Sequence, residues 1–439
     1  MTLKERNYKI LYRTTNFCFD LHDNMDILPK QKLEFDLEVF IMHISFVTLG
    51  AFGHINPTLA LVTELIKRGV RVTYFSPEAF REIIEPTGAR FVPVPSWMAE
   101  NDKHNDGGDE NQQDDGGVAA VVPFLFLKEA GAYIDTVLDT LKEDKPDAIV
   151  HDFAGIAGTM AADILKVPNI MLYTSYPSND TYSVAAGFEN VSEDHPMRQA
   201  FAALAKEYAD KYGCRLMTVK EIFDGQGDFN LVMMQKKLVP NYESFDDKFV
   251  FTGVQIGKRT AFGSWKAPDN GKPLLYSSLG TAFNNWPEYY PILFDAVRDL
   301  DINVFAALGA VDPDSLKDIP ANVEVGQMVP QLDILSQASV FITHGGMGGT
   351  GEAIYYGVPM IAIPQMEEQA ITARQIEKLG LGCAFLDKNK ITSQSLKEAI
   401  IKLLTDPSYK KTVDEFSQDM RQLGGATASA EALIKFLDK

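Results

Sequence analysis

The sequence predicts an α/β protein built from two Rossmann-like, doubly wound parallel-sheet domains that face each other across a cleft. From Met42 onward, short runs rich in β-branched residues alternate with longer helical patterns, which is typical of parallel βαβ units. The alternation lapses into Gly, Pro, Lys and Asn around 252–273 and then restarts, as expected for a linker between domains. The 439 residues leave room for both domains, because one domain takes roughly 100 to 200 residues.

These transitions divide the chain into five parts: 1–41, 42–255, 256–272, 273–420 and 421–439. The first part is an N-terminal extension of unknown structure that lacks the basic start, apolar middle and cleavage site of a signal peptide. An appended start, an extra element and a disordered tail all fit its composition. The second and fourth parts are the sheet domains, the third is the linker, and the last is a C-terminal helix.

The first domain shows five strand-like runs, at 43–49, 70–76, 89–94, 147–152 and 169–174. Helical patterns are expected between or after them, at 56–69, 126–144 and 155–166. The apolar run VAAVVPFLFL at 118–127 has the length of a strand. The insert at 100–117 carries seven acidic residues and one lysine without an apolar anchor, which predicts a mobile surface loop over the cleft.

The second domain repeats this pattern. Its expected strands are 273–280, 302–308, 323–328, 340–345 and 359–364. Its expected helices are 288–299, 332–338, 348–357 and 368–380. The tail from 392 is helical throughout, with breaks expected at Pro407 and at Gly424-Gly425.

Composition excludes several classes of partner. Sixty acidic residues against 41 basic ones give a formal net charge of −19 at pH 7, which disfavours nucleic acid as a partner. No stretch approaches the roughly 20 apolar residues needed to cross a bilayer, so no integral membrane segment is expected. Cys18, Cys214 and Cys383 are widely separated and show no disulfide or zinc spacing. We therefore expect a soluble protein of the cytoplasm.

The first strand is followed by the turn TLGAFGHINP, in which His54 comes at the start of a helix and Pro57 suits a first helical turn. An imidazole at the carboxyl end of a parallel strand lies where ligands bind, and it can act as a general base if a carboxylate orients it. The alternative is that His54 only caps its helix. A dinucleotide site is disfavoured, because Ser76 stands where an acidic ribose ligand would be expected.

The strand at 147–152 delivers Asp152 to the same sheet edge as His54. Carboxyl ends of parallel strands meet at one edge, so the two residues form a plausible pair of base and orienting carboxylate. Asp152 could also do no more than cap the helix that begins near Gly155.

The second domain carries the glycine-rich turn HGGMGGTGE between a strand and a helix, which leaves backbone N–H groups open at a positive helix end. This composition favours a bound diphosphate, although a tight connection would use similar residues. His344 precedes the turn, Glu352 lies within the following helix and Gln369 follows the next strand, so a diphosphate, a diol and a sugar could be bound in succession. Ser278 and Thr281 end the first strand of this domain and face the same space.

On these motifs the sequence resembles the GT-B fold family of UDP-sugar-dependent glycosyltransferases, specifically the bacterial macrolide-type members. The resemblance runs from Met42 to about Lys439 and is most specific over the stretch VGQMVPQLDILSQASVFITHGGMGGTGEAIYYGVPMIAIPQMEEQ. It implies an acceptor-binding domain at 42–255, a UDP-sugar-binding domain at 273–420 and a C-terminal helix that crosses back to the first domain.

The resemblance also implies roles for individual residues. His54 takes the proton from an acceptor hydroxyl, Asp152 is its partner, and the hydroxyl attacks the anomeric carbon with inversion. Glu352 holds the ribose hydroxyls, Val329 and Gln331 lie at the uracil, and Glu368 and Gln369 lie at the donor sugar. The diphosphate is bound, with no metal or other cofactor, by Ser278, Thr281, His344, Gly346, Gly348, Gly349 and Thr350.

Two positions depart from the family pattern. Met328 stands where a tryptophan commonly stacks on the uracil, so preference for that base is open, and Gly349 stands where many members have serine. The acceptor is expected to be a macrolide, phenol, sterol or lipid. Its candidate contacts, each of which could equally be core, are Trp97, Phe124, Phe126, Phe153 and Tyr176.

The expected enzyme is a monomer or weak dimer that transfers a sugar, glucose as first choice. Two alternatives remain open: a GT-B-fold nucleotide-sugar epimerase and a catalytically silent UDP-sugar-binding subunit.

Overall fold

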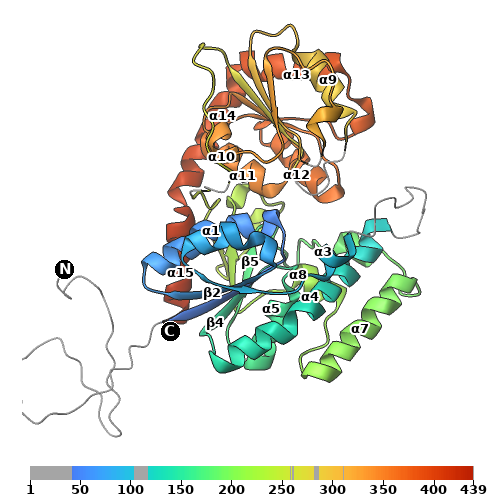
Figure 1. The fold of residues 1–439 in the computed structure, drawn as a ribbon, viewed down its shortest axis with the longest axis vertical. Helices are drawn as coiled ribbons and strands as arrows, with labels where there is room; N and C mark the ends of the chain where they lie inside the picture. The colour runs from blue at the N-terminus through green and yellow to red at the C-terminus, as the bar shows by residue number, and fades with distance from the viewer. Residues whose placement is uncertain are drawn as a thin grey trace, which may run out of the picture. The chain divides into compact units, whose positions relative to one another are not determined.

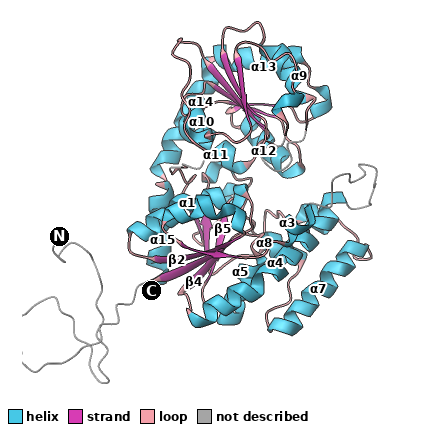
Figure 2. Ribbon diagram, viewed as in Figure 1, coloured by secondary structure: helices cyan, strands magenta, loops and turns pink. Residues whose placement is uncertain are grey.

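A computed structural model describes residues 42–102, 117–257, 259, 262–280, 286–309 and 311–438. Two fully parallel sheets with helices packed around them make up this part of the chain (Figure 2). The α/β fold class predicted from the alternation of strands and helices is confirmed. The extension at 1–41, the insert at 103–116 and Thr281 lie outside the described residues.

The first sheet has seven strands in the order β3-β2-β1-β4-β5-β6-β7. Their bounds are β1 His43–Val47, β2 Arg71–Ser76, β3 Arg90–Pro93, β4 Ala148–His151, β5 Asn169–Tyr173, β6 Phe229–Val232 and β7 Phe249–Phe251. The helices of this part are α1 Phe52–Lys67, α2 Arg81–Ile84, α3 Trp97–Asp102, α4 Gly117–Glu143, α5 Ile156–Leu165, α6 Ala186–Glu189, α7 Pro196–Tyr212 and α8 Val219–Asp224. Every residue of β1 is buried, as expected for a central strand covered on both faces.

The second sheet has six strands in the order β10-β9-β8-β11-β12-β13. Their bounds are β8 Leu274–Ser278, β9 Asn303–Ala307, β10 Val323–Gly326, β11 Val340–Thr343, β12 Met360–Ala362 and β13 Gly382–Ala384. The helices are α9 Tyr289–Val297, α10 Gln331–Leu335, α11 Met347–Tyr356, α12 Glu367–Lys378, α13 Ser393–Thr405, α14 Pro407–Gln422 and α15 Gly425–Leu437. The expected breaks at Pro407 and Gly424 separate the last three helices, and Gly424 has a φ of 85° that favours glycine.

Strand order fixes where a ligand can bind. In the first sheet the chain leaves β1 toward β2 and β3 and then returns to place β4 on the other side of β1. In the second sheet the same reversal occurs between β8 and β11. A crevice opens at such switch points, beyond the carboxyl ends of the strands. The turns after β1, β4, β8 and β11 are therefore the positions that the fold offers to a ligand.

Several local predictions were wrong. Helix α1 begins at Phe52, so Pro57 lies in its second turn and not its first. Helix α4 includes the run at 118–127 and begins at Gly117, before the helix start expected at 126. Helix α4 packs against α5 and α7, which buries Ala120 and Leu127 and partly buries Val122, Phe124 and Phe126. Strands β6, β7 and β13, each of three or four residues, were not predicted.

The C-terminal helix α15 packs against α1 (Figure 1). The Phe436 ring lies 5.0 Å from the Phe229 ring of β6, and Ser429 Oγ donates to Thr252 Oγ1 at 2.8 Å. Along the exposed side, Arg68 Nη2 pairs with Glu431 Oε1 at 3.0 Å. The last helix of the chain thus contacts elements near the first sheet. Among the described residues, no helix is long and apolar enough to cross a membrane.

Candidate active site

A cavity of about 830 Å³ lies between the strand ends of the two sheets. One wall comes from the start of α1 and from the turns after β4 and β5. The opposite wall comes from the turns after β8, β10 and β11 and from the first half of α11. A third contribution, from residues 256, 257, 259, 262 and 263, comes from the segment that joins the two sheets. The cavity therefore occupies the switch points of both sheets.

His54 and Asp152 meet at the first wall. His54 is the third residue of α1 and lines the cavity, whereas Asp152 directly follows β4 and is fully buried. His54 Nδ1 lies 2.7 Å from Asp152 Oδ2. Asp152 Oδ1 accepts hydrogen bonds from the backbone N–H groups of Ala154 at 3.0 Å and Gly155 at 2.8 Å. Asp152 thus does both things considered from its sequence context: it satisfies the turn before α5 and it contacts the imidazole.

The surroundings of His54 favour its cationic form. Burial alone lowers the pKa of His54, but the charge of Asp152, the hydrogen bond to it and the charge of Glu368 together outweigh burial and raise this pKa above its ordinary value. When His54 donates Nδ1–H to the carboxylate, Nε2 keeps its lone pair. An imidazole held in this way can accept a proton and then be stabilised as a cation.

His151, the neighbour of Asp152, points elsewhere. Its ring is buried, with Nδ1 3.0 Å from the Asp152 carbonyl oxygen and Nε2 beside Asn169 Oδ1. Burial lowers its pKa. His151 therefore fixes the end of β4 from within the core and does not line the cavity.

The opposite wall is made largely of backbone. Gly346 caps α11, and the first turn of this helix contains Met347, Gly348 and Gly349, all four of which line the cavity. The first N–H groups of a helix have no partner within it, and the helix dipole makes that end positive. A Cβ on Gly346 would lie 2.3 Å from His344 Nε2, so only glycine fits there without a shift of the buried ring. This wall can bind an anion such as a diphosphate.

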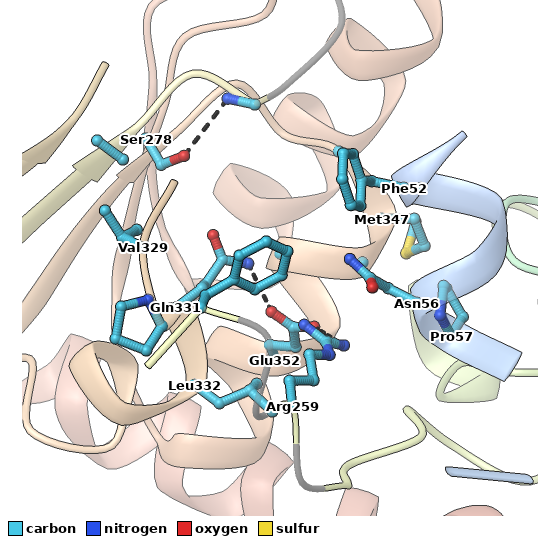
Figure 3. A pocket seen from close by; sticks show the side chains of 18 of the residues that line it. Phe52, Asn56, Pro57, Arg259, Ser278, Val329, Gln331, Leu332, Met347 and Glu352 are labelled. Atoms are coloured by element: carbon cyan, nitrogen blue, oxygen red, sulfur yellow. Dashed lines mark hydrogen bonds and ion pairs between the residues drawn. The ribbon is translucent and has the colours of Figure 1, made fainter. Parts of the chain in front are cut away.

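Three side chains stand around that helix end. Burial lowers the pKa of His344 to about 4, while a hydrogen bond to the Ser278 backbone acts in the opposite direction, so the ring is neutral at pH 7. Ser278 lines the cavity, and its Oγ accepts a hydrogen bond from the Gly280 N–H at 3.4 Å (Figure 3). Thr350 is fully buried behind the turn, where its Oγ1 has no partner among the described residues. Positive potential at this wall therefore comes from the helix and not from an imidazolium.

Glu352, one turn further along α11, is 3% exposed and holds both its oxygens in hydrogen bonds. Arg259 Nη2 donates to Oε1 at 2.6 Å, and Gln331 Nε2 donates to Oε2 at 2.6 Å. Figure 3 shows the Arg259 guanidinium and the Gln331 amide beside the Glu352 carboxylate. Sequence reasoning placed Glu352 and Gln331 at the nucleoside but missed Arg259, because it lies in a segment whose composition indicated only a linker.

The remaining predicted donor residues divide into lining and supporting positions. Val329 lines the cavity next to Met328, which is 47% exposed. Glu368 lines it as well, and Ser175 Oγ donates to Glu368 Oε1. Gln369 is buried instead, with Oε1 accepting from the Gln365 N–H at 2.7 Å. Gln369 therefore shapes the start of α12 rather than the cavity surface.

Among the five predicted acceptor contacts, Phe153 lines the cavity, and its ring centroid lies 5.6 Å from that of His54. Phe124 and Phe126 pack against the core around α4, Trp97 begins α3, and none of the three lines the cavity. Tyr176 is buried, and its O–H donates to Thr372 Oγ1 of α12 at 3.1 Å. Lining residues that sequence reasoning missed include Phe52, Asn56, Thr174, Phe262 and Tyr356.

No group of three or more His, Cys, Asp or Glu side chains in the described ranges could hold an ion.

Comparison with known proteins decides the family. The chain is 35% identical over 405 residues to NDP-glycosyltransferase YjiC of Bacillus subtilis (strain 168), covering 90% of this chain and 98% of that protein. This chain belongs to the macrolide-type UDP-glycosyltransferase family. It is therefore a glycosyltransferase of the GT-B fold, and the predicted resemblance is confirmed.

Other similarities agree with this assignment for the glycosyltransferase. Residues 291–435 match the model of the erythromycin biosynthesis protein CIII-like C-terminal domain. The chain is 30% identical over 408 residues to demethyllactenocin mycarosyltransferase of Streptomyces fradiae, covering 89% of this chain and 86% of that protein. The solved structure of the glycotransferase of kitacinnamycin superposes with a TM-score of 0.78 at 28% identity, covering 90% of this chain and 99% of that one.

Proposed function

We propose that this glycosyltransferase moves a sugar, glucose as first choice, from a UDP-sugar to a hydroxyl of a hydrophobic small molecule, with inversion at the anomeric carbon. The observation that carries the proposal is the 2.7 Å contact between His54 Nδ1 and Asp152 Oδ2 in the same cavity as the amide-rich start of α11. One wall offers a base and the other offers an anion site. Transfer between an acceptor and a nucleotide-sugar needs both.

The proposed reaction begins at the acceptor hydroxyl. His54 Nε2 takes the hydroxyl proton, and the oxygen forms a bond to the anomeric carbon while the bond from that carbon to the UDP oxygen breaks. Attack opposite the leaving group inverts the configuration. Asp152 stabilises the imidazolium that forms. His54 then releases the proton to solvent or to the departing UDP.

UDP departs as an anion, so the reaction requires stabilisation of the negative charge that develops on its diphosphate. The N–H groups of Met347, Gly348 and Gly349 and the dipole of α11 supply fixed positive potential at that wall. Because His344 is neutral, it can donate a hydrogen bond without adding charge. This arrangement supports a mechanism that uses no metal ion and no other cofactor.

The first wall and the relatives support the proposed acceptor class. Phe52, Phe153 and Phe262 line the cavity near His54, which favours an apolar acceptor that carries a hydroxyl. Relatives include oleandomycin glycosyltransferase of Streptomyces antibioticus, 29% identical over 396 residues. We therefore propose natural products such as macrolides, phenols and sterols as acceptors. A cytoplasmic location and a monomeric or weakly dimeric state belong to the same proposal.

The test is a mass-spectrometric assay of the purified full chain with UDP-glucose, a panel of macrolide, phenolic and sterol acceptors, and a chelator present. We expect an acceptor mass increased by one hexose, with the product of β configuration by NMR. Retained configuration would contradict the inverting mechanism. Conversion of UDP-glucose to another UDP-sugar without acceptor would favour the epimerase. UDP binding without turnover on any donor would favour the silent subunit.

A further inference from the structure

Glu352 forms the centre of a buried polar network in the wall of the cavity. Its two carboxylate oxygens accept from Arg259 and Gln331, each at 2.6 Å, and Tyr276 O–H donates to Gln331 Oε1 at 3.1 Å. The side chains of Arg259 and Glu352 are 14% and 4% exposed. The protein itself therefore pairs the carboxylate on both oxygens.

Arg259 stands apart from the other lining residues. Among the described residues that line the cavity it is the single Lys or Arg, whereas Asp333, Glu352 and Glu368 are acidic. It comes from the segment between β7 and β8 and reaches a helix that begins nearly 90 residues later in the chain. Its placement thus joins the inter-sheet segment to the nucleoside side of the cavity.

Pairing of this kind changes how a site discriminates between ligands. A buried carboxylate that depends on a ligand hydroxyl for its hydrogen bond loses that partner when the hydroxyl is absent, and the unpaired group makes the analogue bind poorly. In this chain, when the ligand lacks that hydroxyl, Arg259 and Gln331 still donate hydrogen bonds to Glu352. The ligand hydroxyl adds to a satisfied carboxylate and does not complete an unsatisfied one.

We propose that Arg259, acting through Glu352, makes the donor site tolerant of the pentose, so that ribonucleoside and 2′-deoxyribonucleoside diphosphates bind with similar affinity. The inference rests on the proposed function, because it takes Glu352 as the contact of the ribose. Arg259 is on this view a specificity-determining residue that positions Glu352 rather than a group that takes part in sugar transfer.

The experiment measures the dissociation constants of UDP and 2′-deoxy-UDP by titration calorimetry, since these ligands differ by one hydroxyl. For the wild-type chain we expect the two constants to agree within about threefold. In Arg259→Met the Oε1 atom loses its donor, and only the ribose hydroxyl can replace it. The ratio of the 2′-deoxy-UDP constant to the UDP constant should then rise about tenfold, the size of one hydrogen bond to a charged group.

Matched variants separate this effect from a simple loss of charge. Loss of the Arg259 cation also weakens the binding of UDP and of 2′-deoxy-UDP by a similar factor. This common factor cancels in the ratio of the two dissociation constants. Arg259→Lys keeps the charge and a donor and should hold the ratio within about threefold of wild type. The double variant Arg259→Met, Glu352→Gln lacks the carboxylate and should return the ratio to the wild-type value. Arg81→Met, which breaks an exposed pair with Glu78, should change neither affinity.

Two results would overturn the inference: a wild-type preference for UDP above about 30-fold, or equal weakening of both nucleotides in Arg259→Met. The ratio of dissociation constants for the wild-type chain is measured without any variant. This part of the test therefore remains valid even if Arg259→Met does not fold. The single variant Glu352→Gln tests the foundation separately. If it binds UDP as tightly as wild type, Glu352 is not at the ribose and the proposed donor site is wrong, whatever Arg259 does.

Discussion

The two walls of the cavity solve different electrostatic problems with different parts of the chain. The first wall uses one imidazole and one fully buried carboxylate, 2.7 Å apart, contributed by residues 98 positions apart in the sequence. The second wall uses backbone N–H groups and a helix dipole, with Gly346, Gly348 and Gly349 keeping side chains out of the way. Proton transfer needs a titrating group, whereas a fixed anion needs fixed dipoles.

This difference predicts how each wall responds to substitution. At the first wall the proposed mechanism gives the chemistry to a single side chain, so its removal should stop turnover and leave the nucleotide bound. At the second wall the positive potential is spread over several N–H groups, so removal of one side chain should matter less than the addition of one. The predictions that follow test this contrast, from the largest expected effect to the smallest.

His54→Ala removes the proposed base. We expect turnover to fall by about 100-fold or more, the size of a lost general base, with the UDP dissociation constant unchanged within twofold. Steady-state kinetics and titration calorimetry measure the two quantities on the same preparation. Turnover near the wild-type rate would show that another group takes the proton, and a parallel loss of UDP binding would show that the walls are not independent.

Asp152→Asn removes the charge that raises the pKa of His54. Because His54 must be neutral to accept a proton, the acid limb of kcat/KM in wild type should lie above pH 6.5, and activity should be lost as pH falls through it. In the variant burial dominates, so the limb should move to lower pH while kcat falls on the order of 10- to 100-fold. Asp163→Asn on α5 is the control and should leave the limb in place. An unmoved limb in Asp152→Asn would contradict the assignment.

Gly346→Ala and Gly348→Ala contrast packing with binding in one helix turn. The Cβ of the first would lie 2.3 Å from the buried His344 ring, so we expect a loss of about 1–3 kcal/mol in the free energy of unfolding. The Cβ of the second meets nothing within 4 Å, so stability should be unchanged or slightly higher. Because Gly348 lines the cavity at the proposed diphosphate site, the added methyl group should lower UDP affinity about tenfold. Denaturant unfolding and calorimetry measure both; identical behaviour of the two variants would refute the contrast.

Phe153→Leu and Tyr176→Phe separate an acceptor contact from a packing residue. Phe153 lines the cavity beside His54, so its replacement should raise the acceptor KM several-fold. The Tyr176 O–H donates to Thr372 Oγ1, and its loss should cost about 1 kcal/mol of unfolding free energy with the acceptor KM unchanged. A changed acceptor KM in Tyr176→Phe would return Tyr176 to the acceptor site, as its sequence context first suggested.

Much of the fold could be predicted because its signals are local. The strands at 43–47 and 71–76 follow from dense β-branched and aromatic runs, and the turn after the first of them follows from Gly50. Three-residue strands such as β7 and β13 carry too few residues for a pattern to emerge. The helix expected at 126–144 was found, but its start at Gly117 was missed, because an apolar segment of ten residues looks alike as a buried strand or as part of a helix.

The candidate site was predictable to the extent that strand order brings residues to one edge. His54 and Asp152 could be expected to meet because both follow strands of one parallel sheet. Trp97 and Phe126 could not be separated from Phe153, since aromatic residues have the same signature in a core and in a pocket. Which aromatic side chain lines the cavity depends on which face of each helix packs against the core. A single sequence does not determine that face.

From its sequence alone this protein is a GT-B glycosyltransferase with two parallel sheets, a histidine and an aspartate at the edge of one sheet, and a glycine-rich helix start at the edge of the other. Those features depend on neighbours within a few positions and on the order of strands. The pairing of Arg259 with Glu352, of Ser175 with Glu368 and of Tyr176 with Thr372 was decided only by tertiary structure. Each pair joins residues 93 to 196 positions apart, and their contact depends on how buried charges and hydroxyls find partners when the two sheets pack together.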